Sequence, residues 1–409
     1  MKKIAVVLSV VALAASMVAA ADRGPITIGA VYPTGGSQGP GGTAEYNGVL
    51  LAAEYVNARG GVDGRPIRVE LRETDSPDQV PAAMASLIDD GVPVILGSYG
   101  STISRPAAEI AQERGIVFWE TGAVGQLGMG AVAGDRVFRF PPTGVSLGRA
   151  AVSFAVEQLV PKLGGSASDL RYSVLYVDDY YGRAVGEGAL AQIREAGLTL
   201  AAEVPYRIAD ADYASIIRAV AEADTDVLLV SAYLDDGIAL RAETVRQRVP
   251  LIASVGTSSS YCMHEFGQAL GADAVGLFAS DKPDGHVLDP AKLSPDAADA
   301  LVWARDQYQQ RFDHAMTAPA LTGFAGGLAL FRHVMPEAAS VTPDAIAAAA
   351  RAVKIPQGGL PNGSGLDFAA SGTDNQRAIS VIWEWVAPGE RAVVWPPAFA
   401  TRSILPLEI

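Results

Sequence analysis

The 409-residue chain is 49% hydrophobic, carries a net charge of −14 and contains one cysteine, Cys262. The acidic balance excludes a protein that binds nucleic acid or an anionic membrane by charge, because both need basic surfaces. A lone cysteine excludes an internal disulfide, and we expect Cys262 to be buried as a small apolar side chain. The length predicts two domains or lobes, at roughly 100–200 residues each.

The N-terminus has the pattern of a secretory signal peptide. Lys2 and Lys3 precede an apolar stretch over 4–18, and small alanines follow up to Ala21. The apolar stretch is shorter than the roughly 20 residues that span a bilayer. We therefore predict a cleaved signal over 1–21, a periplasmic location and no membrane insertion after cleavage. Removal of the two lysines gives the mature chain a charge of −16.

Strand and helix patterns alternate through the first part of the chain. We expect strands over 26–31, 67–71, 92–96 and 116–119, and helices over 43–56, 80–88 and 103–114. Ser76 to Gln79 form a capping box with a proline at the first helical position. This β-α-β order predicts a parallel sheet with helices on both faces.

The alternation is interrupted at 138–144 and then restarts. Further strands are expected near 171–177, 198–204, 226–231, 250–254 and 274–278. Three helices without intervening strands follow, near 294–313, 319–335 and 342–353, and then an alternating strand over 379–385. Helices that lack a sheet of their own must pack on an earlier lobe. The pattern therefore predicts two α/β lobes and a chain that crosses between them more than once.

The glycine-rich stretch "GSQGPGGTA" (36–44) matches three motifs in part. Gly39 to Ala44 fit a dinucleotide fingerprint, 36–43 fit a phosphate loop with Gly42 in place of its lysine, and 35–39 fit a nucleophile elbow around Ser37. The elbow and the fingerprint both need a tight strand-to-helix turn, and the pattern places the helix no earlier than about Thr43. We expect instead a mobile loop at the carboxyl edge of the first strand, where open α/β sheets bind ligands.

No residue pattern indicates catalysis, a metal or a cofactor. None of the four histidines has a ligand-like neighbour at helical spacing, so we expect no metal site. A serine triad is neither proposed nor excluded by the sequence. Asp178 and Asp179 could form a carboxylate dyad, but adjacent residues at a strand end point apart. We expect them to cap the following helix.

The stretch "LGSYGSTISRP" (96–106) lies between the third strand and the third helix. N–H groups at a helix start lack partners, and the helix dipole is positive there. The hydroxyl groups of Ser101 and Thr102 add donors. We interpret this stretch as a cradle for a carboxylate or another small anion.

Four stretches resemble the type I periplasmic solute-binding proteins of ABC importers, in particular the branched-chain amino acid (Leu/Ile/Val) receptors. They are "ITIGAVYPTGGSQGPGGTAEYNGVLLAAEYVNARGGVDGRPIRVEL" (26–71), "VILGSYGSTISRPAAEIAQERGIVFWETGA" (94–123), "VLYVDDYYGRAVGEGA" (174–189) and "DNQRAISVIWEW" (374–385). The resemblance implies two Rossmann-like doubly wound lobes around a ligand cleft, with three crossovers, near 140–143, 280–284 and 360–368. It implies a first lobe of 22–141 plus 282–362 and a second of 142–281 plus 363–409.

The resemblance also implies binding residues in both lobes. Ser101 falls where the family uses a hydroxyl for the ligand's carboxylate, with Thr102 beside it. The backbone of Gly122 and Ala123 falls where the family meets the carboxylate and the ammonium. The predicted residues of the second lobe are Tyr181, Tyr233 and Ser258.

Two positions depart from the family pattern. Val124 stands where a second ligand-binding threonine is expected. The stretch "SVGTSSSY" (254–261) has no glutamate to pair an ammonium. A buried ammonium without an anionic partner is costly, so Glu120, Asp235 or Asp236 would have to substitute if the ligand is an α-amino acid.

The leading hypothesis is a non-catalytic substrate-binding component of an ABC transporter. It would capture a small solute, a branched-chain amino acid or a related carboxylate or amide, by hinge closure, and deliver it to a permease in the inner membrane. We expect a monomer with no cofactor and no nucleic-acid partner. Two alternatives remain: an exported α/β serine hydrolase that uses Ser37, and a ligand-sensing module for a membrane receptor.

Overall fold

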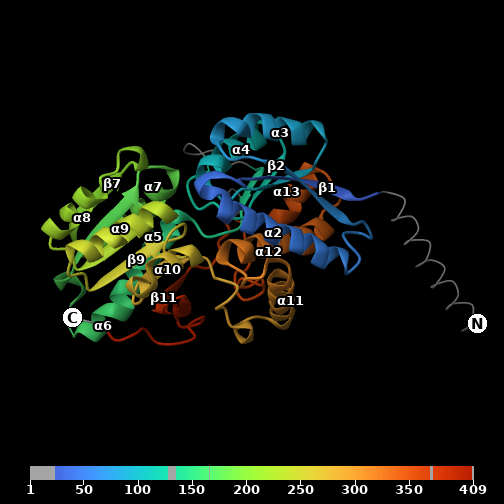
Figure 1. Ribbon diagram of the computed structural model, residues 1–409. Helices are drawn as coiled ribbons and strands as arrows, with labels where there is room; N and C mark the ends of the chain where they lie inside the picture. The colour runs from blue at the N-terminus through green and yellow to red at the C-terminus, as the bar shows by residue number, and fades with distance from the viewer. Residues whose placement is uncertain (1–23, 128–134, 165, 369–371, 408–409) are drawn as a thin grey trace, which may run out of the picture.

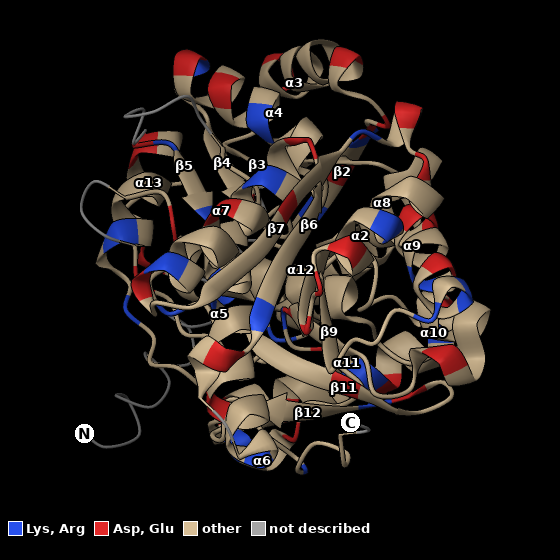
Figure 2. Ribbon diagram, turned by 90° about the vertical axis from the view of Figure 1, so that its left-hand side faces the viewer, with Lys and Arg blue, Asp and Glu red and all other residues tan. Residues whose placement is uncertain are grey.

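The computed structural model describes residues 24–127, 135–164, 166–368 and 372–407, which form two α/β lobes side by side (Figure 1). The proposed signal peptide, 1–21, lies outside these residues. None of the helices in the described ranges is long and apolar enough to cross a membrane. Charged residues of both signs are spread over the outer helices (Figure 2).

The first lobe is built on a five-stranded parallel sheet with the order β2-β1-β3-β4-β5. Its strands are β1 (Ile26–Tyr32), β2 (Ile67–Glu73), β3 (Val94–Gly97), β4 (Val117–Glu120) and β5 (Val137–Arg139). The helices packed around this sheet are α2 (Gly39–Asn57), α3 (Val80–Asp89), α4 (Ser101–Arg114), α11 (Pro295–Phe312), α12 (Ala318–Leu328) and α13 (Pro343–Ala352). The parallel sheet predicted from the β-α-β order is confirmed.

The second lobe holds a seven-stranded sheet with the order β12-β11-β10-β9-β8-β6-β7. Its strands are β6 (Arg171–Val177), β7 (Thr199–Tyr206), β8 (Val227–Ser231), β9 (Ala253–Thr257), β10 (Phe278–Asp281), β11 (Val381–Ala387) and β12 (Glu390–Trp395). The first five run parallel, whereas β11 is antiparallel to both of its neighbours. Its helices are α5 (Gly144–Phe154), α6 (Val160–Leu163), α7 (Tyr180–Glu195), α8 (Tyr213–Glu222), α9 (Leu234–Gln247) and α10 (His264–Leu270).

The helices without strands between them pack on the first lobe, as expected. Helix α12 lies against α2 with the two backbones almost in contact. A Cβ on Gly48 would overlap the carbonyl oxygen of Ala320, and one on Gly323 would overlap that of Glu45. The Nε1 of Trp119 also donates to the carbonyl of Gly326, 3.0 Å away, which joins β4 to the same helix. Glycine at these positions therefore allows the close packing that attaches the late helices to the early sheet.

The prediction of a mobile loop at 36–44 is wrong, because this stretch is helical. A short 3₁₀ turn, Gly36–Gln38, runs directly into α2, which begins at Gly39. Pro40 occupies the first turn, where its fixed φ suits a helix and its missing N–H leaves no bond unmade. The glycines that resemble a loop instead let the chain pack tightly, because a Cβ on Gly42 would overlap the carbonyl of Pro33.

Other boundaries differ from the prediction at the sheet edges. Strands β5 and β12 were not expected, and β9 and β10 begin at Ala253 and Phe278, later than the predicted 250 and 274. Both unexpected strands are edge strands, and β5 is only three residues long. The capping box at Ser76 is confirmed, with side chain and backbone bonds in both directions. The division at residues 141, 281 and 362 stays a prediction.

Candidate functional site

Nine residues from both lobes enclose a small cavity. The first lobe contributes Tyr99, Gly100, Ser101, Gly122 and Val124, and the second contributes Tyr181, Tyr233, Ser258 and Ser259. The cavity volume is about 10 Å³, which is room for about one water molecule. Five of the seven predicted site residues are therefore brought together here. Their role in ligand binding stays a prediction.

Two predicted residues lie beside the cavity without lining it. The Thr102 hydroxyl accepts a hydrogen bond from Gln38 Nε2 at 3.2 Å, so it helps to fix the turn before α2. The Ala123 N–H donates to the Glu120 carboxylate at 2.6 Å. The side chain of Val124, which stands at the expected threonine position, gives the cavity wall an apolar surface.

Helix α4 presents its first turn to the cavity. Gly100 precedes this helix and makes no side-chain cap. The N–H groups of Ser101 and Thr102 have no acceptor among the described residues. Ser101 Oγ accepts from the N–H of Gly125 at 3.0 Å, which fixes the side chain and leaves its own proton free to donate. Ser101 thus supplies a hydroxyl donor and an N–H donor at the positive end of a helix.

The Glu120 carboxylate fixes the backbone around this turn by accepting hydrogen bonds from it. Its Oε1 accepts from the N–H groups of Gly122 and Ala123, both at 2.6 Å, and from Ser98 at 3.1 Å. The hydroxyl of Ser104 donates to its Oε2. Burial is the largest influence on the pKa of Glu120 and raises it, while these hydrogen bonds oppose the shift. The N–H groups of Gly122 and Ala123 are therefore already paired.

On the second-lobe side of the cavity, Asp179 positions two tyrosines, Tyr181 and Tyr233. Asp179 Oδ1 accepts from the N–H groups of Tyr181 and Gly182 at 2.9 Å, which caps α7. Its Oδ2 accepts from the Tyr233 hydroxyl at 2.6 Å. The expected capping by Asp179 is confirmed. Asp178 pairs with Arg183 at 2.5 Å instead of forming a dyad.

Tyr99 is a cavity residue that the sequence interpretation overlooked. Its φ of +84° lies in the left-handed region, which is strained for a bulky residue. Its ring packs against Gly41 of α2, where a Cβ would overlap it. The hydroxyl approaches Ser259 Oγ at 3.4 Å and so bridges the two lobes. The only signal in the sequence that could have identified Tyr99 as a site residue was its position within the 96–106 stretch.

Lys282 and Glu45, which were not predicted as site residues, are two buried ionisable groups that contact Gly122. Lys282 is 1% exposed, and its Nζ donates to the Gly122 carbonyl at 3.1 Å. It makes no ion pair among the described residues. Glu45 Oε1 accepts from Thr121 Oγ1 at 2.6 Å, and Oε2 has no hydrogen-bond partner. Lys282 could have been noticed as a charged residue inside a predicted crossover, whereas nothing marked Glu45.

Burial sets the protonation of Glu45. It raises the pKa of this carboxyl to about 8, with Lys282 opposing the shift. The unfolded chain has the ordinary value of 4.5, so the folded state binds more protons between these two pH values. Stability is therefore lost as the pH rises through this window.

We expect Glu45→Gln to remove this pH-dependent loss. The difference in unfolding free energy between the variant and the wild type should grow in favour of the variant by about 1.4 kcal/mol per pH unit. Urea unfolding at pH 5.5, 6.5 and 7.5 measures it. Glu113→Gln, at an exposed site on α4, serves as the control and should run parallel to the wild type. A constant difference across the series would mean that Glu45 is ionised in the fold.

The cavity offers no carboxylate to an ammonium group. None of its nine residues is acidic. Glu120 is occupied by backbone N–H groups, Asp235 is exposed, and the buried Asp236 accepts from the Tyr206 hydroxyl. None of the three substitutes considered for the missing glutamate therefore lines the cavity.

The alternative chemistries find no support in the geometry. Ser37 is exposed on the 3₁₀ turn and has no hydrogen bond to a histidine in the part of the chain that the structure describes. Within the same residues, no cluster of three or more His, Cys, Asp or Glu side chains could hold a metal ion. Cys262 is free and buried, as expected.

Comparison with known proteins agrees with this architecture. The periplasmic binding protein family matches residues 25–382. A Leu/Ile/Val-binding protein homolog 8 from Brucella abortus (strain 2308) is 26% identical over 385 residues, which cover 93% of each chain.

Solved structures share the fold at lower identity. A leucine binding protein, LivK, from Thermotoga maritima MSB8 is 18% identical with a TM-score of 0.74, over 90% of this chain and 97% of that one. An ABC transporter solute binding protein from R. palustris, in complex with benzoate, is 16% identical with a TM-score of 0.73, over 94% and 100%. With a family match over most of its length and a two-lobed fold around an interlobe cavity, this chain belongs to the periplasmic binding protein family.

Proposed function

We propose that this protein is the substrate-binding component of an ABC importer and that its solute is a carboxylate or amide without an ammonium group. It closes its two lobes on the solute and delivers it to a permease in the inner membrane. The observation that carries the ligand class is the cavity itself. It is lined by hydroxyl and N–H donors from both lobes and by no carboxylate.

The hydrogen-bond donors of the cavity come from both lobes. Ser101 supplies its hydroxyl and its N–H from the first turn of α4. Ser258 has no side-chain partner among the described residues, and Ser259 Oγ contacts only the Tyr99 hydroxyl. These groups can donate to a carboxylate or to an amide oxygen. An ammonium in their place would be buried without an anion, at a cost of several kcal/mol.

Glu45 does not supply the missing anion. Its carboxyl lies behind Gly122, outside the cavity lining, and its pKa of about 8 keeps most of it protonated at pH 7. The fold itself accommodates both ligand classes, since one solved neighbour is a leucine binding protein and another holds benzoate. A branched-chain amino acid therefore remains the competing ligand.

Contacts to both lobes at once favour the closed form. Tyr99 and Ser259 already meet across the lobes, and Lys282 joins the segment after β10 to Gly122. A solute that bonds to Ser101 on one side and to Ser258 on the other would add to these contacts. Closure would thus depend on a polar group of the solute that bonds to Ser101 and Ser258 at the same time.

Calorimetric titration of refolded, ligand-free protein tests the ligand class. We expect 4-methylpentanoate to bind at least 10-fold more tightly than leucine, which is the same skeleton with an ammonium added. Tighter binding of leucine would contradict the ligand class but leave solute capture intact. Failure of both, together with no small molecule in the mass spectrum of the native protein, would contradict capture itself.

Ser101→Ala should weaken the binding of the preferred solute by roughly 1–2 kcal/mol, because one hydrogen bond to a charged group is lost. This corresponds to a Kd about 5- to 30-fold higher, measurable by the same titration. Ser37→Ala, at an exposed position, is the matched control and should bind as the wild type does. Equal affinities in the two variants would remove Ser101 from the site, and labelling of the wild type but not of Ser37→Ala by a fluorophosphonate would instead indicate a hydrolase.

A further inference from the structure

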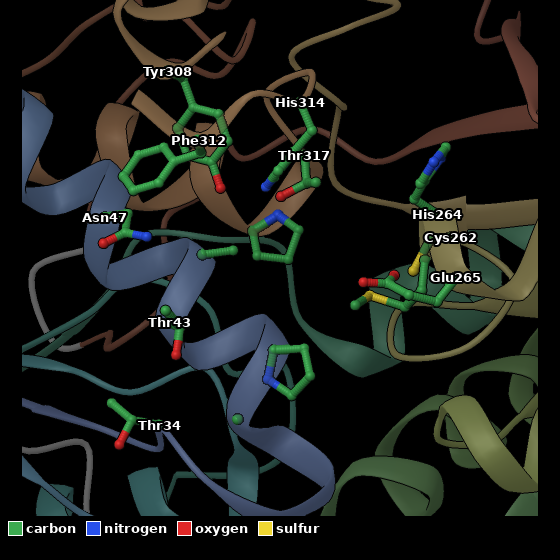
Figure 3. A pocket seen from close by; sticks show the side chains of 15 residues that line it. Thr34, Thr43, Asn47, Cys262, His264, Glu265, Tyr308, Phe312, His314 and Thr317 are labelled. Carbon is green, nitrogen blue, oxygen red and sulfur yellow. The ribbon is translucent and has the colours of Figure 1, made fainter. Parts of the chain in front are cut away.

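A second and much larger pocket lies between the lobes (Figure 3). Its walls are the first turns of α2, the 262–265 segment of the second lobe, and 308–319 from the end of α11 onward. Its volume is about 460 Å³, within the range of roughly 300–1,000 Å³ typical of ligand sites. We call it the interlobe groove.

The interlobe groove has an apolar floor and a polar rim. Cys262, Tyr308 and Pro319 are buried at its base, and Ala44, Met263 and Phe312 are half-buried along its sides. The rings of Tyr308 and Phe312 lie 4.6 Å apart between centroids. The exposed side chains of Thr43, His264, Glu265 and His314 form the rim. Such a surface suits an apolar or aromatic chain whose outer face stays in contact with water.

Tyr99 connects the small cavity to the helix that lines the groove. It lines the cavity, while its ring rests on Gly41, between the groove residues Pro40 and Thr43 of α2. Its hydroxyl reaches Ser259, three residues before the groove residue Cys262. The cavity residue Tyr99 thus contacts α2, whose first turns also line the groove. Its strained φ of +84° marks a residue that the surrounding structure holds in place.

Neither the small cavity nor the interlobe groove can by itself bind both the polar and the apolar part of a small solute. The cavity of about 10 Å³ holds the polar donors but leaves no room for a hydrocarbon body. The groove offers that room but has no cluster of buried donors. We propose that the solute is an amphipathic acid or amide, with its polar head at Ser101 and Ser258 and an apolar tail that passes Tyr99 into the interlobe groove. This inference rests on the proposed function and specifies its substrate class.

Titration with two acids of different tail length tests the inference. We expect decanoate to bind at least 10-fold more tightly than 4-methylpentanoate, since each additional buried methylene adds about fourfold in affinity. Ala44→Trp places a large ring in the groove. It should weaken decanoate binding at least 10-fold and leave 4-methylpentanoate binding unchanged. Ala58→Trp, exposed at the far end of α2, is the control and should change neither.

Each other outcome overturns the inference in a recognisable way. If Ala44→Trp leaves decanoate binding unchanged, the tail does not occupy the groove, although the proposed capture of an acid stands. If Ala44→Trp weakens both acids equally while its unfolding free energy matches that of Ala58→Trp, the groove is not a separate tail site. If leucine binds and neither acid does, solute capture stands and the amphipathic ligand is excluded.

Discussion

Glu120→Ala is expected to lose at least about 4 kcal/mol of unfolding free energy, together with solute binding. The substitution removes the acceptor for the N–H groups of Ser98, Gly122 and Ala123 and for the hydroxyl of Ser104. Each buried donor left without a partner costs about 1–3 kcal/mol. Urea unfolding measures the stability, and titration at a temperature where the variant is folded measures binding. The segments that carry Ser101 and Val124 should then no longer keep the positions that form the cavity.

Glu120→Gln separates hydrogen bonding from charge at this position. The amide oxygen can still accept from the backbone N–H groups, while its NH₂ group can donate to the Ser104 hydroxyl. We expect a loss of about 1–2 kcal/mol, well below that of the alanine variant. Glu113→Ala, on the exposed face of α4, should cost less than about 0.5 kcal/mol. A Glu120→Ala protein as stable as the Glu113→Ala control would contradict the central role given to this carboxylate.

Arg391→Met should lower the unfolding free energy by about 3–5 kcal/mol, because it leaves Asp284 buried without its cation. The guanidinium lies 2.9 Å from Asp284 Oδ2, and the two side chains are 6% and 1% exposed. It also donates to the Cys262 carbonyl at 2.6 Å and lies over the ring of Trp383 at 4.1 Å. These contacts tie β12 to the segment that follows β10. Urea unfolding at pH 7 measures the change.

A double-mutant cycle identifies the cause. Arg391→Met combined with Asp284→Asn should be more stable than Arg391→Met alone, because the unpaired charge is gone. The partly exposed pair of Arg311 and Glu54 is the control, and Arg311→Met should cost less than about 1 kcal/mol. If the double variant is no more stable than the single one, the loss comes from the packing of the Trp383 and Trp385 rings rather than from charge.

Much of the fold followed from local patterns along the chain. The alternation of strand and helix signals predicted the parallel first sheet, and the run of late helices predicted that the chain returns to an earlier lobe. Clear caps at Ser76 and Asp179 marked helix starts that the structure confirms. These signals are local, because a cap or a periodic apolar stripe depends on residues within one or two turns.

The predictions failed where packing overrode the local pattern. The glycines of 36–44 resemble a flexible loop in sequence, yet they begin α2, and Pro33, Thr34 and Tyr99 pack against them. Strand β5 has only three residues, all of them buried, and is too short to show a period of two. Strand β12 begins at the exposed Glu390, and only its centre is buried.

The sequence by itself determined the class of the fold, the late return of the chain to the first lobe and the place of Ser101 at a helix start, because helix starts and strand ends depend on neighbouring residues. The other predicted cavity residues came from the resemblance to the family. Only the tertiary structure decided which charges face the site. It assigned Glu120 to backbone N–H groups, placed Lys282 and Glu45 against Gly122, and brought Tyr99 into contact with Gly41 of α2. Burial and pairing depend on what packs on a residue from all sides, and Lys282 meets Gly122 across a separation of 160 residues in the sequence.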